Sequence, residues 1–207
     1  MKLSTCSAAL FLSFMVVSSL SAQSAGEEKQ EFGVTVGQLS GTSPGVAGGP
    51  LTLDSGVAVE ANFARKVREL GFGNLYWEVD GLVGPIRYVT GTPTTATHSI
   101  NSVFLTPGVK LQFTPKEPLS PWVAVGGGYG FYHSSNSSIA GGTAAGGTTN
   151  TYAVDFGGGM DWAMNKHYVI RADFRGFYTG APNYGINVPG GQFNFVIGGG
   201  LVWRFSK

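Results

Sequence analysis

The segment from residue 168 to residue 178, YVIRADFRGFY, places three charged side chains, Arg171, Asp173 and Arg175, at alternate positions. Alternate side chains of a β-strand share one face, so this segment has an ionic face and an opposite face that is wholly apolar. Guanidinium and carboxylate groups pair by charge-assisted hydrogen bonds, and buried charges must be paired in this way. The pattern therefore predicts an ion-pair network that either fills the interior of the protein or gates the passage of small solutes.

Seven further segments repeat the two-residue period. The eight amphipathic segments span residues 32–36, 57–63, 75–83, 103–113, 123–131, 152–162, 168–178 and 193–205. No apolar face among them carries a charge. The intervening positions carry six acids and four bases, which are Glu60, Glu78, Asp80, Lys110, Asp155, Asp161, Arg171, Asp173, Arg175 and Arg204.

The composition favours an inside-out arrangement of these segments. Charged residues make up 12% of the chain, against about 25% in soluble domains. That is too few to coat a water-soluble surface, so we expect a closed barrel with its apolar face toward lipid and its polar face inward. A secreted barrel of lipocalin type is the alternative, but it needs a charged exterior that ten strand charges do not supply. The formal net charge of +1 argues against a nucleic-acid partner.

The connections between segments alternate in length. Long, charge-poor connections cover residues 38–55, 84–99, 134–150 and 179–191, whereas short ones cover residues 66–73, 114–120 and 163–166. Short periplasmic turns and longer extracellular loops are typical of outer-membrane barrels. The fold class we predict is therefore all-β, an eight-stranded antiparallel up-and-down transmembrane β-barrel. Pro107 lies within the fourth segment, and because it lacks an N–H donor we expect a bulge at Pro107-Gly108.

The N-terminus has the features of an export signal. Lys2 precedes an apolar run from residue 8 to residue 20, and small residues follow it. This pattern predicts a signal peptide at residues 1–22, cleaved between residues 22 and 25. A short lead at residues 23–30 and the barrel at residues 31–207 would follow. The single cysteine, Cys6, would leave with the leader, so the mature chain would contain no disulfide.

Two stretches carry a family resemblance, Asp155 to Tyr178 and the terminal GGGLVWRF, Gly198 to Phe205. With them the chain resembles the eight-stranded outer-membrane barrel domains of OmpA and OmpX type. The resemblance implies the cell outer membrane as location, and outer-membrane lipid and the barrel assembly machinery as partners. It also implies an assembly signal in the last segment, at Gly198, Gly200, Trp203 and Phe205. The resemblance implies no shared chemistry, and it names no extracellular partner.

One motif could support catalysis. His133, Ser135 and Asn136 form an H-x-S-N pattern that is similar to one in outer-membrane lipid A 3-O-deacylases. A serine nucleophile needs an adjacent base, and that base needs an orienting group. No glutamate follows Glu117 to act with the histidine and the serine. The loop is also so rich in serine that the pattern arises there by chance. The three histidines lack ligand spacing, so we expect neither a metal nor a cofactor.

These observations favour a non-enzymatic outer-membrane barrel with a plugged polar lumen. Its roles would be envelope integrity or surface interaction through extracellular loops. A narrow channel or a carrier of small apolar molecules is the next hypothesis, followed by a lipid A hydrolase.

Overall fold

The structure is a computed structural model. It describes residues 29–42, 45–46, 49–91, 98–135, 137–139, 142–144, 147–182 and 190–205. The expected leader at residues 1–22 and its cleavage point lie outside the described residues. Among the described residues, no helix has the length and apolar character needed to cross a membrane.

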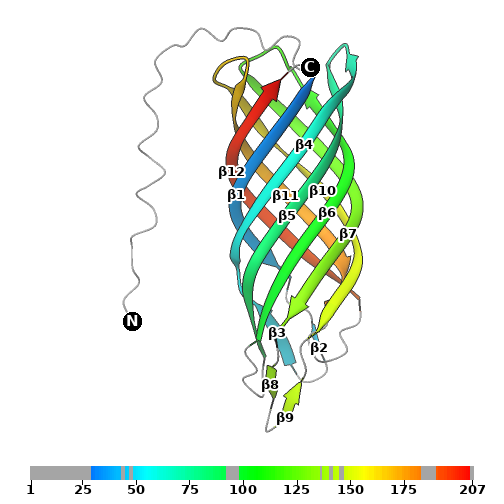
Figure 1. Cartoon of the computed structure of the whole chain (residues 1–207), viewed down its shortest axis with the longest axis vertical. Coiled ribbons are helices and arrows are strands. Elements are labelled where there is room, and N and C mark those ends of the chain that lie inside the picture. Colours follow the sequence, from blue (N-terminus) through cyan, green and yellow to red (C-terminus); the bar gives the residue numbers. More distant parts are fainter. Residues whose placement is uncertain are drawn as a thin grey trace, which may run out of the picture.

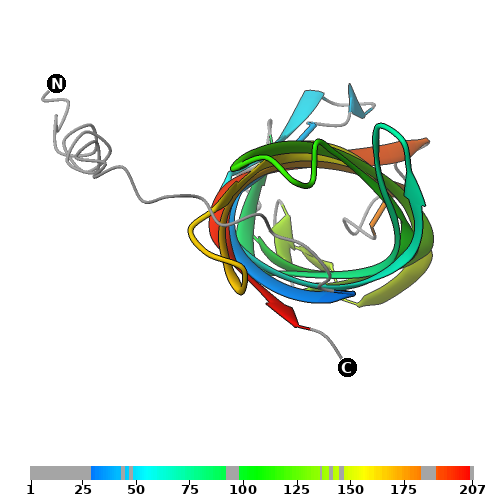
Figure 2. The same cartoon turned by 90° about the horizontal axis from the view of Figure 1, so that it is seen from above.

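Eight long strands close into a barrel, which confirms the predicted fold class. They are β1 (Gln30–Gly41), β4 (Gly56–Leu70), β5 (Gly73–Gly91), β6 (His98–Phe113), β7 (Leu119–Ser134), β10 (Thr148–Ala163), β11 (Tyr168–Gly180) and β12 (Gly191–Phe205). Each long strand pairs antiparallel with the next, and β12 pairs with β1 to complete the ring. The strands are tilted against the long axis, and the view from above shows the closed ring (Figures 1 and 2).

Four short strands lie in the described parts of the connections. They are β2 (Gly45–Val46), β3 (Gly49–Leu53), β8 (Ser137–Ile139) and β9 (Gly142–Ala144). β3 extends the barrel wall by pairing with the end of β5. All four lie at the end of the barrel opposite the C-terminus (Figure 1). We call this the loop end, and we call the opposite end, with the short connections at residues 71–72, 114–118 and 164–167, the turn end.

The boundaries of two expected connections are wrong. The connection expected at residues 66–73 is mostly strand, because β4 continues to Leu70 and β5 begins at Gly73. β5 does not end near residue 84 but continues to Gly91, so the expected connection at residues 84–99 is mostly strand. The extension contains a bulge, because Gly84 pairs with Ser102 whereas Arg87 pairs with Ile100. Three steps along β5 therefore oppose two steps along β6, and a bulge of this kind reverses which side chains point inward.

The bulge expected at Pro107-Gly108 is also wrong. Leu105 pairs with Tyr129 and Gly108 pairs with Gly126, so both strands advance by the same number of residues. The ladder between β6 and β7 only skips the pairs at Thr106 and Pro107. Pro107 lacks an N–H group, so a local gap in the ladder is sufficient and no register shift is needed.

The outer wall is apolar. Large hydrophobic side chains such as those of Val57, Leu201 and Ile197 are more than 60% exposed. The side chains between them point into the lumen and are buried, which follows from the two-residue period of a strand. Every predicted strand charge lies on this inner side.

Candidate functional site in the barrel lumen

The ten predicted strand charges all point into the lumen, and none is more than 5% exposed. Two buried charges were not predicted, Glu31 at the start of β1 and Arg87 beyond the bulge in β5. Alternation with Phe32 and Val34 on β1 is the signal that could have identified Glu31, because it occupies the inward phase.

The first ionic layer lies near the turn end. Arg171 donates hydrogen bonds to both carboxylate oxygens of Asp161, at 2.8 and 2.9 Å, and a further one to Glu31 at 3.1 Å. Arg204 reaches the same Asp161 at 3.1 Å, and Lys110 pairs with Glu31. This layer, which we call the turn-end layer, therefore holds three cations and two carboxylates.

The second ionic layer lies at the middle of the lumen and has the opposite balance. Arg175 is its single cation, and it is fully buried. Five carboxylates lie around this guanidinium, which are Glu78 at 2.7 Å, Asp155 at 3.1 Å, Glu60 at 3.2 Å, Asp173 at 3.7 Å and Asp80 at 4.0 Å. Arg175 is therefore the centre of this arrangement, which we call the central layer.

Trp122 lies between the two ionic layers. The centre of the Arg171 guanidinium is 4.9 Å from the Trp122 ring centroid, and that of Arg175 is 5.2 Å away. Both distances suit a cation–π interaction, which strengthens when the groups are desolvated. One buried indole ring therefore contacts the main arginine of each layer.

The lumen toward the loop end is apolar, so the expectation of a polar lumen holds only for part of its length. We call this part the apolar layer, and its buried members are Leu39, Leu53, Ala58, Leu82, Val89, Ile100, Phe104, Tyr132, Phe177 and Val196. Phe104 stacks on Phe177 with ring centroids 5.0 Å apart and meets Tyr132 edge-on at 5.6 Å.

Polar groups continue beyond the aromatic rings of the apolar layer. The hydroxyl of Tyr132 is 2.6 Å from the Thr179 hydroxyl and accepts a hydrogen bond from Asn194 at 3.0 Å. Gln192 donates a hydrogen bond to the Thr42 carbonyl at 2.7 Å. The lumen therefore has an ionic half at the turn end and a mixed half, mainly apolar, at the loop end.

The hydrolase motif lies at the loop end, outside the lumen. His133 and Ser135 are both exposed, and Asn136 lies outside the described residues. The Nδ1 atom of His133 lies 3.2 Å from the Thr148 hydroxyl, and Ser135 accepts a hydrogen bond from the Ser99 N–H at 3.0 Å. The structure therefore does not place the base against the nucleophile. Within the same described ranges, no group of three or more His, Cys, Asp or Glu residues is arranged to hold a metal ion.

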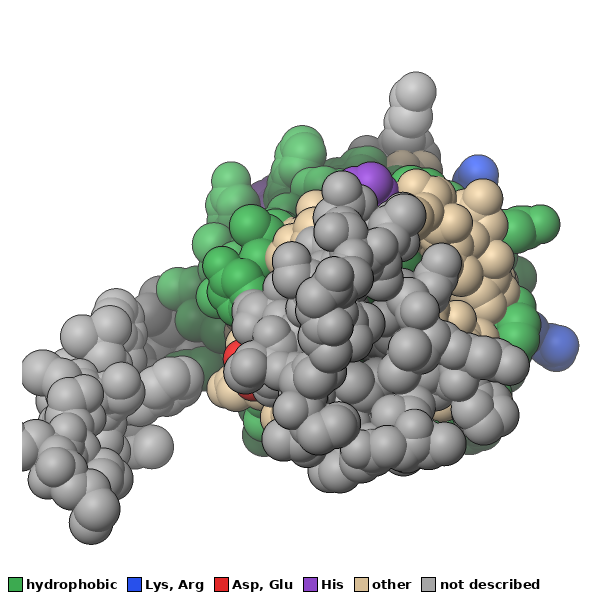
Figure 3. Space-filling view, turned by 90° about the horizontal axis from the view of Figure 1, so that it is seen from below, with side chains coloured by type: hydrophobic (Ala, Val, Ile, Leu, Met, Phe, Trp, Pro, Cys, Tyr) green, Lys and Arg blue, Asp and Glu red, His purple; other side chains and the backbone are tan. Residues whose placement is uncertain are grey.

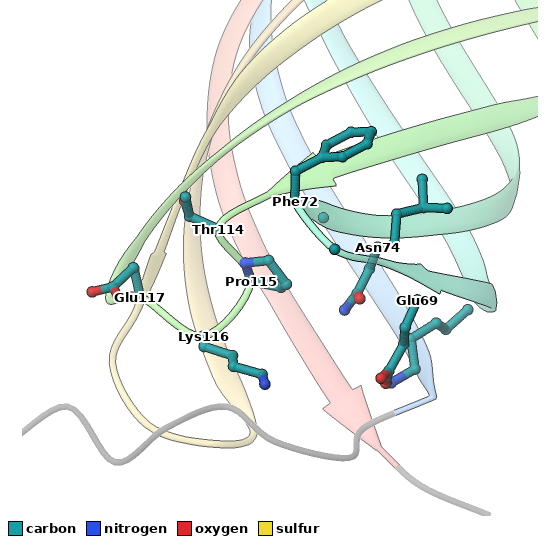
Figure 4. Close-up of a pocket in the computed structure, with 11 residues that line it drawn as sticks. Glu69, Phe72, Asn74, Thr114, Pro115, Lys116 and Glu117 are labelled. Carbon is teal, nitrogen blue, oxygen red and sulfur yellow. The ribbon is translucent and has the colours of Figure 1, made fainter.

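A pocket of about 380 Å³ opens at the turn end, between the β4–β5 turn and the β6–β7 connection. Figure 4 shows Asn74 and Lys116 pointing toward its centre, whereas Glu117 points away. Glu69 is held at 2.5 Å by Lys66 on the same strand. The lining carries both signs of charge on short, exposed turns, so it does not define a charge preference for a ligand.

The loop-end face offers few charges among the described side chains. Figure 3 shows this face with hydrophobic side chains around its edge and only small patches of red, blue and purple. Asp54 is the exposed acid near this end in the part of the chain that the structure describes.

The proposed assembly segment forms the closing strand. Gly198 pairs with Gly37 and Trp203 with Phe32, both across the β12–β1 seam. A Cβ atom added to Gly198 would lie 2.7 Å from the Val36 carbonyl oxygen, so a larger residue there would push the two strands apart. Trp203 and Phe205 lie with their rings 4.9 Å apart at the turn end. The close approach of the two strands therefore gives a structural reason for glycine at position 198.

Comparison with known proteins supports the fold. No protein-family model matches the sequence, and no curated protein matches it either. Among solved structures, the chain is similar to OprG, an outer membrane protein of Pseudomonas aeruginosa, with 13% identity over 88% of this chain and 99% of that one and a TM-score of 0.58. It is also similar to Neisserial surface protein A, with 9% identity over 85% and 97% and a TM-score of 0.51.

A third similar structure is an outer membrane enzyme, PagL, with 14% identity over 86% of this chain and 99% of that one. Its TM-score of 0.43 is too low to carry an argument about activity. The chain therefore has the fold of the eight-stranded outer-membrane β-barrels. Proteins with this fold include both enzymes and non-enzymes, so function must be argued from the lumen and the rims.

Proposed function

We propose that this chain is a non-enzymatic barrel of the cell outer membrane, exported by a cleaved leader, whose lumen is plugged. Its functional surface would then be its extracellular loops, which serve envelope integrity or surface interaction. The observation that carries the proposal is the stack of three layers in the lumen: the turn-end layer, the central layer and the apolar layer. Each is built from side chains that are almost wholly buried.

The size of the barrel supports a plug over a channel. The interior of an eight-stranded barrel is just wide enough for side chains to fill it. Here arginine, lysine, tryptophan and phenylalanine side chains occupy that interior, and the largest of them are less than 2% exposed. A conducting path would have to pass both the Arg175 cluster and the Phe104–Phe177 stack. A narrow channel or a carrier of small apolar molecules is therefore the second choice.

Conductance in planar bilayers tests the plug. We expect the folded protein, identified by its heat-modifiable migration on gels, to give little or no current. Stable, ohmic channels would overturn the plug and favour the channel hypothesis.

The same preparation tests the proposal that the barrel is not an enzyme. If it releases a 3-linked acyl chain from lipid A, and Ser135→Ala abolishes that release, the proposal is overturned.

A charge on the outer wall tests the membrane location. Ala172 is exposed near the middle of β11, on the apolar face. Arginine at a lipid-facing midplane position costs about 2–4 kcal/mol, so Ala172→Arg should reduce folding into bilayers. Ala172→Leu is the matched control and should fold normally. Unchanged stability of the arginine variant in bilayers would contradict a lipid-facing outer wall.

The assembly signal is a proposal of its own. If the machinery reads the last strand, Phe205→Ala should lower the folded fraction in the outer membrane more than Phe195→Ala. Both residues are half-buried rings on the outer face of β12, so loss of lipid contact affects both alike. Equal folded fractions would mean that Gly198 to Phe205 acts only as another strand.

A further inference from the structure

The outer wall at the turn end carries an arginine pair. Arg65 and Arg68 lie at the end of β4, and both are exposed. A register shift between Lys66 and Arg68 inserts Val67 as an extra residue, which is 65% exposed. The bulge brings both arginines onto the outer side of the wall, because Arg65 pairs with Trp77 and Arg68 pairs with Leu75.

No described carboxylate neutralises the arginine pair. Among the residues that the structure describes, neither Arg65 nor Arg68 forms an ion pair. Glu69 is the adjacent acid in the chain, but it is held by Lys66 at 2.5 Å. The exposed charges of the described turn end are mostly positive, and they are Lys29, Arg65, Arg68, Lys116 and Lys166 against Glu69 and Glu117.

Aromatic and apolar side chains lie beside the arginine pair, toward the middle of the wall. Trp77, which is 45% exposed, is the register partner of Arg65 on the next strand. Phe32 and Phe63 face each other one step deeper, also on the outer face. Tryptophan favours the headgroup level of a bilayer, and arginine stems lie along apolar surface while the charged head stays in the polar layer. A ligand here would therefore have an anionic head and an apolar tail.

We propose that Arg65 and Arg68, with Val67 between them and Trp77 beside Arg65, bind the phosphate of an anionic phospholipid in the periplasmic leaflet. The inference rests on the proposed function, which places the turn end at that leaflet. The lateral position favours a lipid over a soluble phosphate, because the patch faces the surrounding bilayer rather than the periplasm. The absence of a free carboxylate in the patch favours an anionic lipid over a zwitterionic one, since nothing described there would pair with the lipid's ammonium group.

The test measures which lipid stays with the folded protein. The full mature chain is folded into phosphatidylcholine bilayers that contain a minority of phosphatidylglycerol, then extracted gently, and the retained lipids are counted by native mass spectrometry. We expect phosphatidylglycerol to be enriched over its share of the bilayer. Near a membrane surface each arginine is worth about fivefold in affinity for anionic lipid, so the double variant R65Q/R68Q should lose most of the enrichment.

Four controls separate the explanations. K116Q/K166Q removes the same charge from the connections and should keep the enrichment. R65K/R68K keeps the charge and should keep most of it, whereas added salt should reduce it in the native protein. Soluble glycerol phosphate should not compete, and full competition would overturn the lipid assignment in favour of a general anion site.

The outcomes also separate this inference from the proposed function. A native protein that inserts, is heat-modifiable and shows no enrichment overturns the lipid site alone. A native protein that fails to insert into any bilayer overturns the membrane location itself. Enrichment that R65Q/R68Q leaves unchanged in a folded variant also overturns the site.

Discussion

The two halves of the lumen close the same barrel by different means. At the turn end, eleven buried charged side chains form the turn-end and central layers, and at the loop end Leu39, Phe104 and Phe177 pack in an apolar layer. The stability of a buried ion-pair network depends on every partner, because removing one side chain leaves an opposite buried charge uncompensated. In an apolar layer, the loss of stability instead grows with the side-chain volume removed. The two halves should therefore respond differently to truncation, although both are equally buried.

The same contrast exists inside the ionic half. The turn-end layer has three cations for two carboxylates, whereas the central layer has one cation for five. A layer with spare cations can lose one and remain paired. The central layer has no replacement for Arg175, so the stability of the ionic half depends on this single residue.

The largest effect is expected from Arg175→Met. The methionine fills part of the space but leaves five buried carboxylates without their cation, and breaking a buried pair in this way costs about 3–5 kcal/mol. The measurement is the free energy of unfolding in bilayers, from urea titration followed by heat-modifiable migration. A loss below about 1 kcal/mol, the range of exposed pairs, would show that the central layer is not held by Arg175.

Phe177→Ala tests the apolar half. Removing a buried phenylalanine ring costs about 3 kcal/mol when the surroundings partly close the cavity, and the change also removes the stack between Phe177 and Phe104. The same urea titration measures the loss. Because both ionic layers remain intact, planar-bilayer conductance should stay as low as in the native protein. Current through this variant would show that the apolar layer alone closes the lumen.

The outer face and most of the ionic half could be predicted from the sequence. Charge is excluded from lipid-facing positions, so the alternation between apolar and charged residues is unambiguous along β11 and β10. Glu60, Asp155 and Arg175 could be assigned inward for this reason. The pairing between them could not, because it depends on strands far apart in the sequence, such as β5 and β11.

Arg87 shows why local alternation is insufficient. Counted from Val83 on the outer face, residue 87 falls on the outer face as well. The bulge between Gly84 and Arg87 adds one residue and turns Arg87 inward, where it is 1% exposed. Nothing in the local pattern fixes the position of such a bulge, although Pro85 lies within it.

The apolar half was missed for a different reason. Residues such as Leu82 and Phe177 point inward, but their strand neighbours are not charged either, being Gly81 and Val83 for the first and Gly176 and Tyr178 for the second. The two-residue period therefore has no contrast there. Only the closed ring shows that these positions meet, because their contacts join strands that are not adjacent in the sequence.

Arg171→Met should have a smaller effect than Arg175→Met. Lys110 still pairs with Glu31, and Arg204 still pairs with Asp161, so each carboxylate of the turn-end layer keeps a cation. The free energy of unfolding then falls only by the contribution of the lost hydrogen bonds between charged groups, about 2 kcal/mol. Urea titration of both variants under one condition gives the difference. Equal losses would contradict the idea that the charge balance of each layer sets its tolerance.

The smallest effect is expected from Trp122→Phe, which tests whether the two ionic layers are linked. The phenyl ring keeps an aromatic face but is a weaker partner for the guanidinium groups of Arg171 and Arg175. The indole Nε1 is buried and has no hydrogen-bond partner among the described residues, so its removal also relieves a desolvated donor. These two opposed effects leave a net loss in the free energy of unfolding of about 1 kcal/mol or less.

A double-mutant cycle measures the link between the two layers. It combines Arg171→Met with Arg175→Met and is repeated in the Trp122→Phe background. If the indole couples the layers, the interaction energy between the two arginines should shrink in that background. An unchanged interaction energy would mean that the turn-end layer and the central layer act independently, and that Trp122 only fills the space between them.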